Sequence, residues 1–115
     1  MPELTDFRVA VLATDGFEEV ELTEPVKALK DAGAEVTILS LKPGKIQGVR
    51  HDLDKTVTVN VDRVIGDVSA EVFDAVHLPG GTVNADSLRM VPEVQTFLRA
   101  IQEAGKPLAA ICHAP

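Results

Sequence analysis

The sequence predicts an α/β fold with a parallel sheet, because short apolar segments alternate with segments of helical periodicity. A strand, a helix and a strand follow one another within residues 7–41, and the same order returns within residues 74–111. The stretch between these two units is irregular. A chain of 115 residues has room for one domain, which would contain both of these units. We therefore expect a single α/β domain over residues 1–115.

The first unit opens with FRVAVLA at residues 7–13, a nearly continuous apolar run that is typical of a strand buried on both faces. A helix is expected over residues 24–33, with Pro25 in its first turn, where a missing N–H costs little, and with Gly33 at its end. EVTILSL, at residues 35–41, is rich in β-branched residues and predicts the second strand. These lengths suit a parallel crossover.

The second unit follows a region of turn residues. TVTVNV alternates within residues 42–66, which predicts short strands or a hairpin at the edge of the sheet. DAVHLPGG, at residues 74–81, predicts a strand that ends in a turn. Residues 92–105 carry one apolar stripe and predict the clearest helix, and KPLAAI at residues 106–111 predicts the last strand.

Three segments follow the carboxyl ends of predicted strands and hold the chemically versatile side chains. They are TDGFEEVE at residues 14–21, PGGTVNAD at residues 79–86 and CHAP at residues 112–115. In a parallel sheet these ends share one edge, and ligands bind in the crevice outside it. We therefore expect the three segments to converge on one site.

Cys112 is the only cysteine, and two hypotheses fit it. A free cysteine is commonly a small buried hydrophobe, which would make its thiol inert. The other hypothesis is a nucleophile elbow, in which a strand stops at the nucleophile and turns into a helix whose N-terminus stabilises the thiolate. His113 would then act as a base or orienting group for the thiol, or else be a half-exposed histidine without a role.

The first and second segments supply candidate partners for that thiol. A run of charge usually faces solvent, and we expect this of Glu19. Glu21 lies between apolar residues just after a strand; when protonated, it could donate a hydrogen bond to a thiolate without repelling it. The backbone N–H of Gly80 or Gly81 could complete an oxyanion hole, although Pro-Gly is also typical of an ordinary turn.

Composition argues against several classes of function. The net charge of −7 and the scattered basic residues disfavour a nucleic-acid partner. No apolar run approaches the roughly 18 residues of a membrane span, and no secretory signal opens the chain. One cysteine cannot form an internal disulfide, and His51 and His77, expected at the surface and in the core, lack metal-ligand spacing. We expect a cytoplasmic protein with no metal and no cofactor.

GFEEVEL, LPGG and ICHAP, in this order and at these separations, resemble the ThiJ/PfpI (DJ-1) superfamily, and within it the PfpI-like intracellular proteases and general stress proteins. The resemblance extends over essentially all 115 residues. It implies a flavodoxin-like, class I glutamine amidotransferase-like three-layer sandwich. Relatives continue after the elbow, so it also implies that this chain is the N-terminal part of a domain that is incomplete at its C-terminus.

The resemblance also implies roles for individual residues. Cys112 matches the family nucleophile and His113 the histidine that follows it. Glu21 matches a glutamate that hydrogen-bonds the thiol, and Glu18 matches a second acid near the site. Gly80 or Gly81 matches the backbone oxyanion donors.

Asp86 is the best match to an acid that, in the PfpI branch, orients the histidine of a neighbouring subunit. Its other interpretation, from the residues alone, is a helix N-cap. The resemblance therefore implies a homodimer or higher homo-oligomer with the site near an interface.

Members of the family are described as peptidases, as cofactor-free glyoxalases, as deglycases and as redox-responsive stress proteins. We expect a Cys112-dependent stress-response enzyme, either a hydrolase or a glyoxalase/deglycase, acting on a peptide or a small reactive carbonyl. The alternative is a redox-sensing or protective protein whose Cys112 oxidises to sulfenic or sulfinic acid without turnover. A flavodoxin-like binding module with an inert buried cysteine is the third hypothesis.

Overall fold

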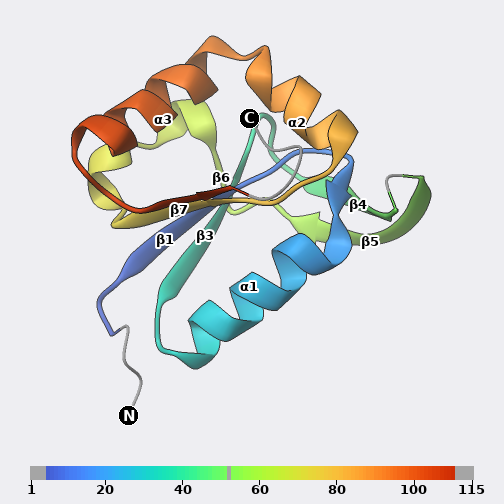
Figure 1. Cartoon of the computed structure of the whole chain (residues 1–115), viewed down its shortest axis with the longest axis horizontal. Coiled ribbons are helices and arrows are strands. Elements are labelled where there is room, and N and C mark those ends of the chain that lie inside the picture. The colour runs from blue at the N-terminus through green and yellow to red at the C-terminus, as the bar shows by residue number, and fades with distance from the viewer. Residues whose placement is uncertain (1–4, 52, 111–115) are drawn as a thin grey trace.

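The computed structural model of the chain describes residues 5–51 and 53–110. A five-stranded parallel sheet lies at its centre, with α1 on one face and α2 and α3 on the other (Figure 1). The predicted three-layer α/β fold is confirmed. The strands, in their spatial order, are β6 (Arg63–Val64), β3 (Glu35–Ser40), β1 (Arg8–Leu12), β7 (Ala75–Leu78) and β8 (Leu108–Ala110).

The strand order reverses between β1 and β7. From β1 the chain adds β3 and then β6 on one side, and it returns to add β7 and β8 on the other side. Val11 of β1 pairs with Ile38 of β3 on one side and with His77 of β7 on the other. A reversal of this kind opens a crevice at the carboxyl ends of the two central strands, which is where open α/β sheets bind ligands.

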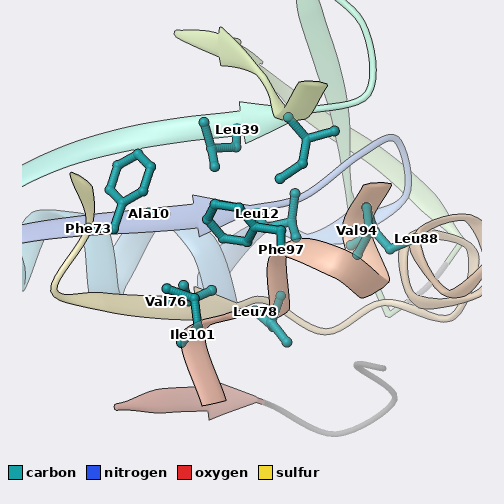
Figure 2. Packing of buried hydrophobic residues seen from close by; sticks show 11 residues of the cluster. Ala10, Leu12, Leu39, Phe73, Val76, Leu78, Leu88, Val94, Phe97 and Ile101 are labelled. Atoms are coloured by element: carbon teal, nitrogen blue, oxygen red, sulfur yellow. The ribbon is translucent and has the colours of Figure 1, made fainter. Parts of the chain in front are cut away.

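Strand β1 is buried on both faces, as its continuous apolar sequence predicts. Ala10 and Leu12 belong to the hydrophobic cluster on the α3 side of the sheet, which Figure 2 shows. Val11 belongs to a second cluster on the α1 side, together with Leu22 of that helix. The central strand therefore joins the two halves of the core.

Helix α3 (Pro92–Glu103) confirms the predicted amphipathic stripe. Pro92 lies in the first turn of the helix, where its missing N–H costs little. Phe97 is buried and meets Phe73 edge to face, with the ring centroids 6.0 Å apart (Figure 2). This aromatic pair ties α3 to the segment that leads into β7.

Helix α1 spans Glu19–Asp31 and begins well before the expected residue 24. Glu18 precedes it in an extended conformation, and Glu19 and Glu21 lie in the first turn, where the positive end of the helix dipole favours acidic side chains. Pro25 is therefore inside the helix, and the prediction that it lies in the first turn is wrong. Pro25 is compatible with a helix start, but the acidic residues before it extend the helix in the N-terminal direction.

Strands β4 (Lys45–Arg50) and β5 (Asp54–Asn60) form the hairpin that the alternating segment predicts. The hairpin does not lie at the edge of the main sheet, because β4 pairs with the short strand β2 (Phe17–Glu18) in a separate three-stranded sheet. The short strand β6, from the same region of the sequence, does lie at that edge, as expected. The Phe17 ring occupies the space that a side chain at position 48 would need, so Gly48 makes the pairing of β2 with β4 possible. The hairpin therefore lies beside the acidic segment that leads into α1.

Several short elements carry no periodicity that would have predicted them. The strands β2 and β6 have two residues each, and two turns of 3-10 helix precede β7. Helix α2 follows the Pro-Gly-Gly turn immediately. The helical elements among them are α2 (Thr82–Arg89) and the two turns of 3-10 helix, η1 (Ile65–Asp67) and η2 (Ala70–Val72). Of the helices in residues 5–51 and 53–110, none has both the length and the apolar character to cross a membrane.

We predict that Gly81→Ala destabilises the fold more than alanine at other glycines. Gly81 has a φ of 113°, and a Cβ there would overlap the carbonyl oxygen of Gly16. The cost should exceed the roughly 1 kcal/mol of a positive φ alone, because backbone atoms would have to separate. Urea unfolding of the full-length protein measures it.

Two other glycines provide matched controls for Gly81→Ala. Gly105 has a φ of 72° but open space around it, so Gly105→Ala should cost only about 1 kcal/mol. Gly66 has an ordinary φ and open space, so Gly66→Ala should be close to neutral. Equal losses for Gly81→Ala and Gly105→Ala would contradict the tight packing between residues 16 and 81.

Candidate active site

The segments that follow β1 and β7 meet at the reversal point of the sheet. The backbone N–H of Glu18 donates to the carbonyl oxygen of Gly80 at 3.0 Å. The backbone N–H of Gly80 donates in turn to Oε1 of Glu21, also at 3.0 Å. Two of the three segments predicted to converge are thus in contact. The third, residues 112–115, lies outside the described residues and carries Cys112 and His113 with it.

Glu21 lies in the first turn of α1 and is held at both its side chain and its backbone. The carboxylate accepts from Gly80, and the carbonyl oxygen lies 2.8 Å from Nε2 of His77. A carbonyl oxygen can only accept, so this contact is a hydrogen bond when Nε2 carries the proton. Together with the bond from Glu18 to Gly80, these contacts fix the start of α1 to the end of β7.

Gly80 and Gly81, the candidate oxyanion donors, lie at this convergence. Gly80 is buried, and its N–H points to the Glu21 carboxylate. Gly81 is the N-cap of α2, and its carbonyl oxygen accepts from the N–H of Ala85 at 2.8 Å. Their role as oxyanion donors stays a prediction, and it requires an N–H to face the reacting carbonyl.

The two preceding acids are both engaged by the end of β4. A carboxylate oxygen of Glu18 accepts from the backbone N–H of His51 at 3.3 Å. Oε1 of Glu19 lies 3.3 Å from the Arg50 guanidinium, and only 20% of the Glu19 side chain is exposed. The expectation that Glu19 faces solvent is wrong, because the pairing of β2 with β4 brings Arg50 over it.

Asn84 is a residue of this region that the sequence analysis missed. It is fully buried, and its Oδ1 accepts from the backbone N–H of Thr14 at 2.7 Å. Its Nδ2 donates to the carbonyl oxygen of Pro79 at 2.9 Å and lies 3.4 Å from that of Gly80. One amide thus joins the segment after β1 to the segment after β7. The sequence gives no signal of this burial, because Asn84 lies in a short segment of mostly polar and small residues.

Asp86 lies on the exposed side of α2, and its carboxylate pairs with Arg89 at 3.2 Å. The N-cap interpretation is wrong, because α2 begins at Thr82 and Gly81 caps it. The side chain is 64% exposed, and its proposed role in a neighbouring subunit stays a prediction.

The other two histidines lie where the sequence analysis expects them. His51 is exposed at the tip of the hairpin, whereas His77 is 8% exposed and belongs to the core. Within residues 5–51 and 53–110, histidine and acidic side chains form no group of three that could hold a metal ion.

The DJ-1/PfpI family model matches residues 7–115. The chain belongs to the DJ-1/PfpI family. The ThiJ/PfpI resemblance inferred from the three motifs is thereby confirmed.

Curated relatives of this DJ-1/PfpI chain carry several functional names. YraA of Bacillus subtilis, named as a candidate cysteine protease, is 42% identical over 108 residues, which are 94% of this chain and 61% of YraA. Deglycase TK1284 of Thermococcus kodakarensis is 39% identical with the same coverage. General stress protein 18 of Bacillus subtilis is 40% identical over 94% of this chain and 60% of its own. The chain thus spans about three fifths of these relatives.

Solved structures agree with the family assignment. The VC2308 protein superposes with a TM-score of 0.85 at 31% identity, over 95% of this chain and 54% of its own. DJ-1beta of Drosophila melanogaster gives a TM-score of 0.83 at 29% identity, over 95% of this chain and 56% of its own.

We predict that Asn84→Asp destabilises the protein by about 3 kcal/mol at neutral pH, since a buried carboxylate would face the carbonyl oxygens of Pro79 and Gly80 without a proton to donate. The loss should shrink as the pH falls, because a protonated carboxyl can donate to Pro79. Thermal unfolding of the full-length protein across pH measures this. Asn60→Asp, at an exposed position of β5, is the control and should be near neutral. A pH-independent loss would contradict the assigned donor role.

Proposed function

We propose that the protein is a PfpI-type cysteine enzyme that acts on reactive carbonyl compounds through Cys112. The register of β7 and β8 carries this proposal. The two strands are parallel, with Leu78 opposite Ala110. Gly80 follows Leu78 by two residues and Cys112 follows Ala110 by two, which supports the proposal that the Cys112 thiol belongs at this edge of the sheet, near Gly80. The Gly80 N–H bonds the Glu21 carboxylate, which then lies within reach of the thiol.

The sequence-predicted roles fit this arrangement. Glu21, when protonated, donates a hydrogen bond to the Cys112 thiolate through the carboxyl oxygen that Gly80 does not hold. Because the Gly80 N–H is held by Glu21, the backbone N–H of Gly81, together with that of His113, is the proposed donor to the carbonyl oxygen of the substrate. His113 moves protons as the adduct forms and breaks down. Glu18 adds a second carboxylate at the start of α1, where the backbone N–H of His51 holds it.

The first chemical step is addition to a carbonyl. The thiolate sulfur donates an electron pair to the carbonyl carbon and forms a C–S bond, while the C=O π pair moves to oxygen. That oxygen is held by the backbone N–H groups and takes a proton from His113 or from water. In the glyoxalase reaction a proton then moves from the hemithioacetal carbon to the neighbouring carbonyl carbon through an enediol, which leaves a thioester on Cys112. Water adds to the thioester carbonyl, the C–S bond breaks with its electron pair returning to sulfur, and the hydroxy acid leaves. The step uses no metal and no cofactor.

Small reactive carbonyls such as methylglyoxal are the substrates we propose, in a glyoxalase or deglycase reaction. The names of relatives support this choice, since TK1284 and an Escherichia coli relative at 38% identity are called deglycases. Peptide hydrolysis begins with the same addition and is tested in the same assay series. A role in the stress response agrees with the name of general stress protein 18.

We also propose that the active form is a homo-oligomer in the cytoplasm. Asp86 supports this part of the proposal, because it lies on an exposed face of α2, where a neighbouring copy can reach it. In the oligomer, Asp86 of one copy would orient His113 of another.

We predict that Cys112→Ala abolishes turnover of methylglyoxal by the full-length protein, while the unfolding temperature changes little. The alkylation rate of the wild-type thiol with iodoacetamide should reach its plateau well below pH 8.5, which is about where an ordinary thiol ionises. Intact-mass analysis identifies the modified residue.

Two outcomes would contradict the enzyme proposal. A thiol that alkylates only near pH 8.5 would indicate the inert cysteine of a binding module. A reactive thiol that oxidises with peroxide, in a protein that turns over neither carbonyl compounds nor peptides, would indicate the redox sensor.

A further inference from the structure

Pro25 leaves the backbone carbonyl oxygen of Glu21 without its usual hydrogen-bond donor in α1. In an α-helix the N–H of residue 25 would donate to the carbonyl oxygen of residue 21, but proline has no N–H. The proline ring also crowds that carbonyl. The Glu21 carbonyl oxygen therefore needs a donor from outside the helix, since an unsatisfied carbonyl in a partly buried position is costly.

His77 of β7 supplies that donor. Its Nε2 lies 2.8 Å from the Glu21 carbonyl oxygen, and the residue is 8% exposed. The imidazole lines the same groove as Pro25 and Leu29 of α1, so its surroundings are largely apolar. In such surroundings a hydrogen bond is strong, and a missing one is correspondingly expensive.

The same residue, Glu21, is held at its other end by Gly80. The Gly80 N–H donates to the Glu21 carboxylate at 3.0 Å, and Gly80 follows His77 by three residues on the same chain segment. The end of β7 thus hydrogen-bonds both the backbone and the side chain of Glu21. Loss of the backbone contact would free the first turn of α1 to shift and move the carboxyl with it.

The geometry points to His77 as a positioning residue that sets the place of the Glu21 carboxyl at the Cys112 thiol. This inference rests on the proposed function, because it takes Glu21 as the donor to the thiolate. Pro25 leaves the Glu21 carbonyl oxygen without a donor from its own helix, and His77 of the neighbouring strand donates to that oxygen instead. Neither residue is proposed to contact the substrate.

The test uses His77→Leu and His77→Gln in the full-length protein. Leucine fills the space without a donor, whereas the glutamine amide reaches about as far as Nε2 and can donate to Glu21. At about pH 6, His77→Leu should slow iodoacetamide alkylation of Cys112 by about threefold to tenfold, the effect of one net hydrogen bond. His77→Gln should retain the wild-type rate within about twofold.

A second variant restores the missing bond from within the helix. In the double variant Pro25→Ala, His77→Leu, the new N–H at residue 25 donates to Glu21, and the alkylation rate should recover. This variant also serves if His77→Leu alone fails to fold. Ile101→Val, on the opposite face of the sheet, controls for simple loss of stability and should leave the alkylation rate unchanged.

Glu21→Leu distinguishes the failure of this inference from the failure of the proposed function. If Glu21→Leu slows alkylation but His77→Leu does not, His77 is no positioning residue, and the proposed role of Glu21 stands. If Glu21→Leu has no effect, the role of Glu21 at the thiol is wrong, and the inference about His77 is overturned with it. Slowing by both changes, without a further loss when they are combined, supports the inference.

Discussion

The contact between the first turn of α1 and the end of β7 is the constraint on which the site depends. The reversal of strand order makes β1 and β7 neighbours, so the segments that follow them must leave the sheet side by side. Glu18, Glu21, His77 and Gly80 join these segments through backbone and side-chain hydrogen bonds. A crevice at such a reversal is usually open to ligands. Here the residues that join the two segments beside it include those of the proposed chemistry.

Much of this architecture follows from local pattern. The continuous apolar run at residues 7–13 implies a strand buried on both faces, and the structure places Ala10 and Val11 in opposite halves of the core. The apolar stripe of residues 92–105 likewise gives α3 and its buried face. Convergence of the segments at 14–21 and 79–86 could be predicted because parallel strands direct their carboxyl ends to one edge.

What could not be predicted depends on contacts between distant residues. The start of α1 was obscured because Pro25 resembles a helix start, whereas the external donor that permits it inside the helix lies on β7. Burial of Asn84 depends on carbonyl and N–H groups of two separate loops, which a single segment does not reveal. The pairing of β4 with β2 depends on the fit of the Phe17 ring against Gly48, across a long sequence separation.

The groups that stabilise this part of the fold are also groups of the proposed function. Asn84 and His77 satisfy buried carbonyls that the chain path would otherwise leave without donors, so both have a structural reason to be present. The same bonds fix the relative positions of Glu21 and Gly80, and with them the wall that the Cys112 segment is proposed to meet. Fixed positions for these groups suit the proposed catalysis, because a donor aimed at a thiolate or an oxyanion is effective only when its position is set before the reaction. Because Pro25 cannot donate to the Glu21 carbonyl oxygen, the position of Glu21 depends on its contacts with the end of β7 as well as on its own helix.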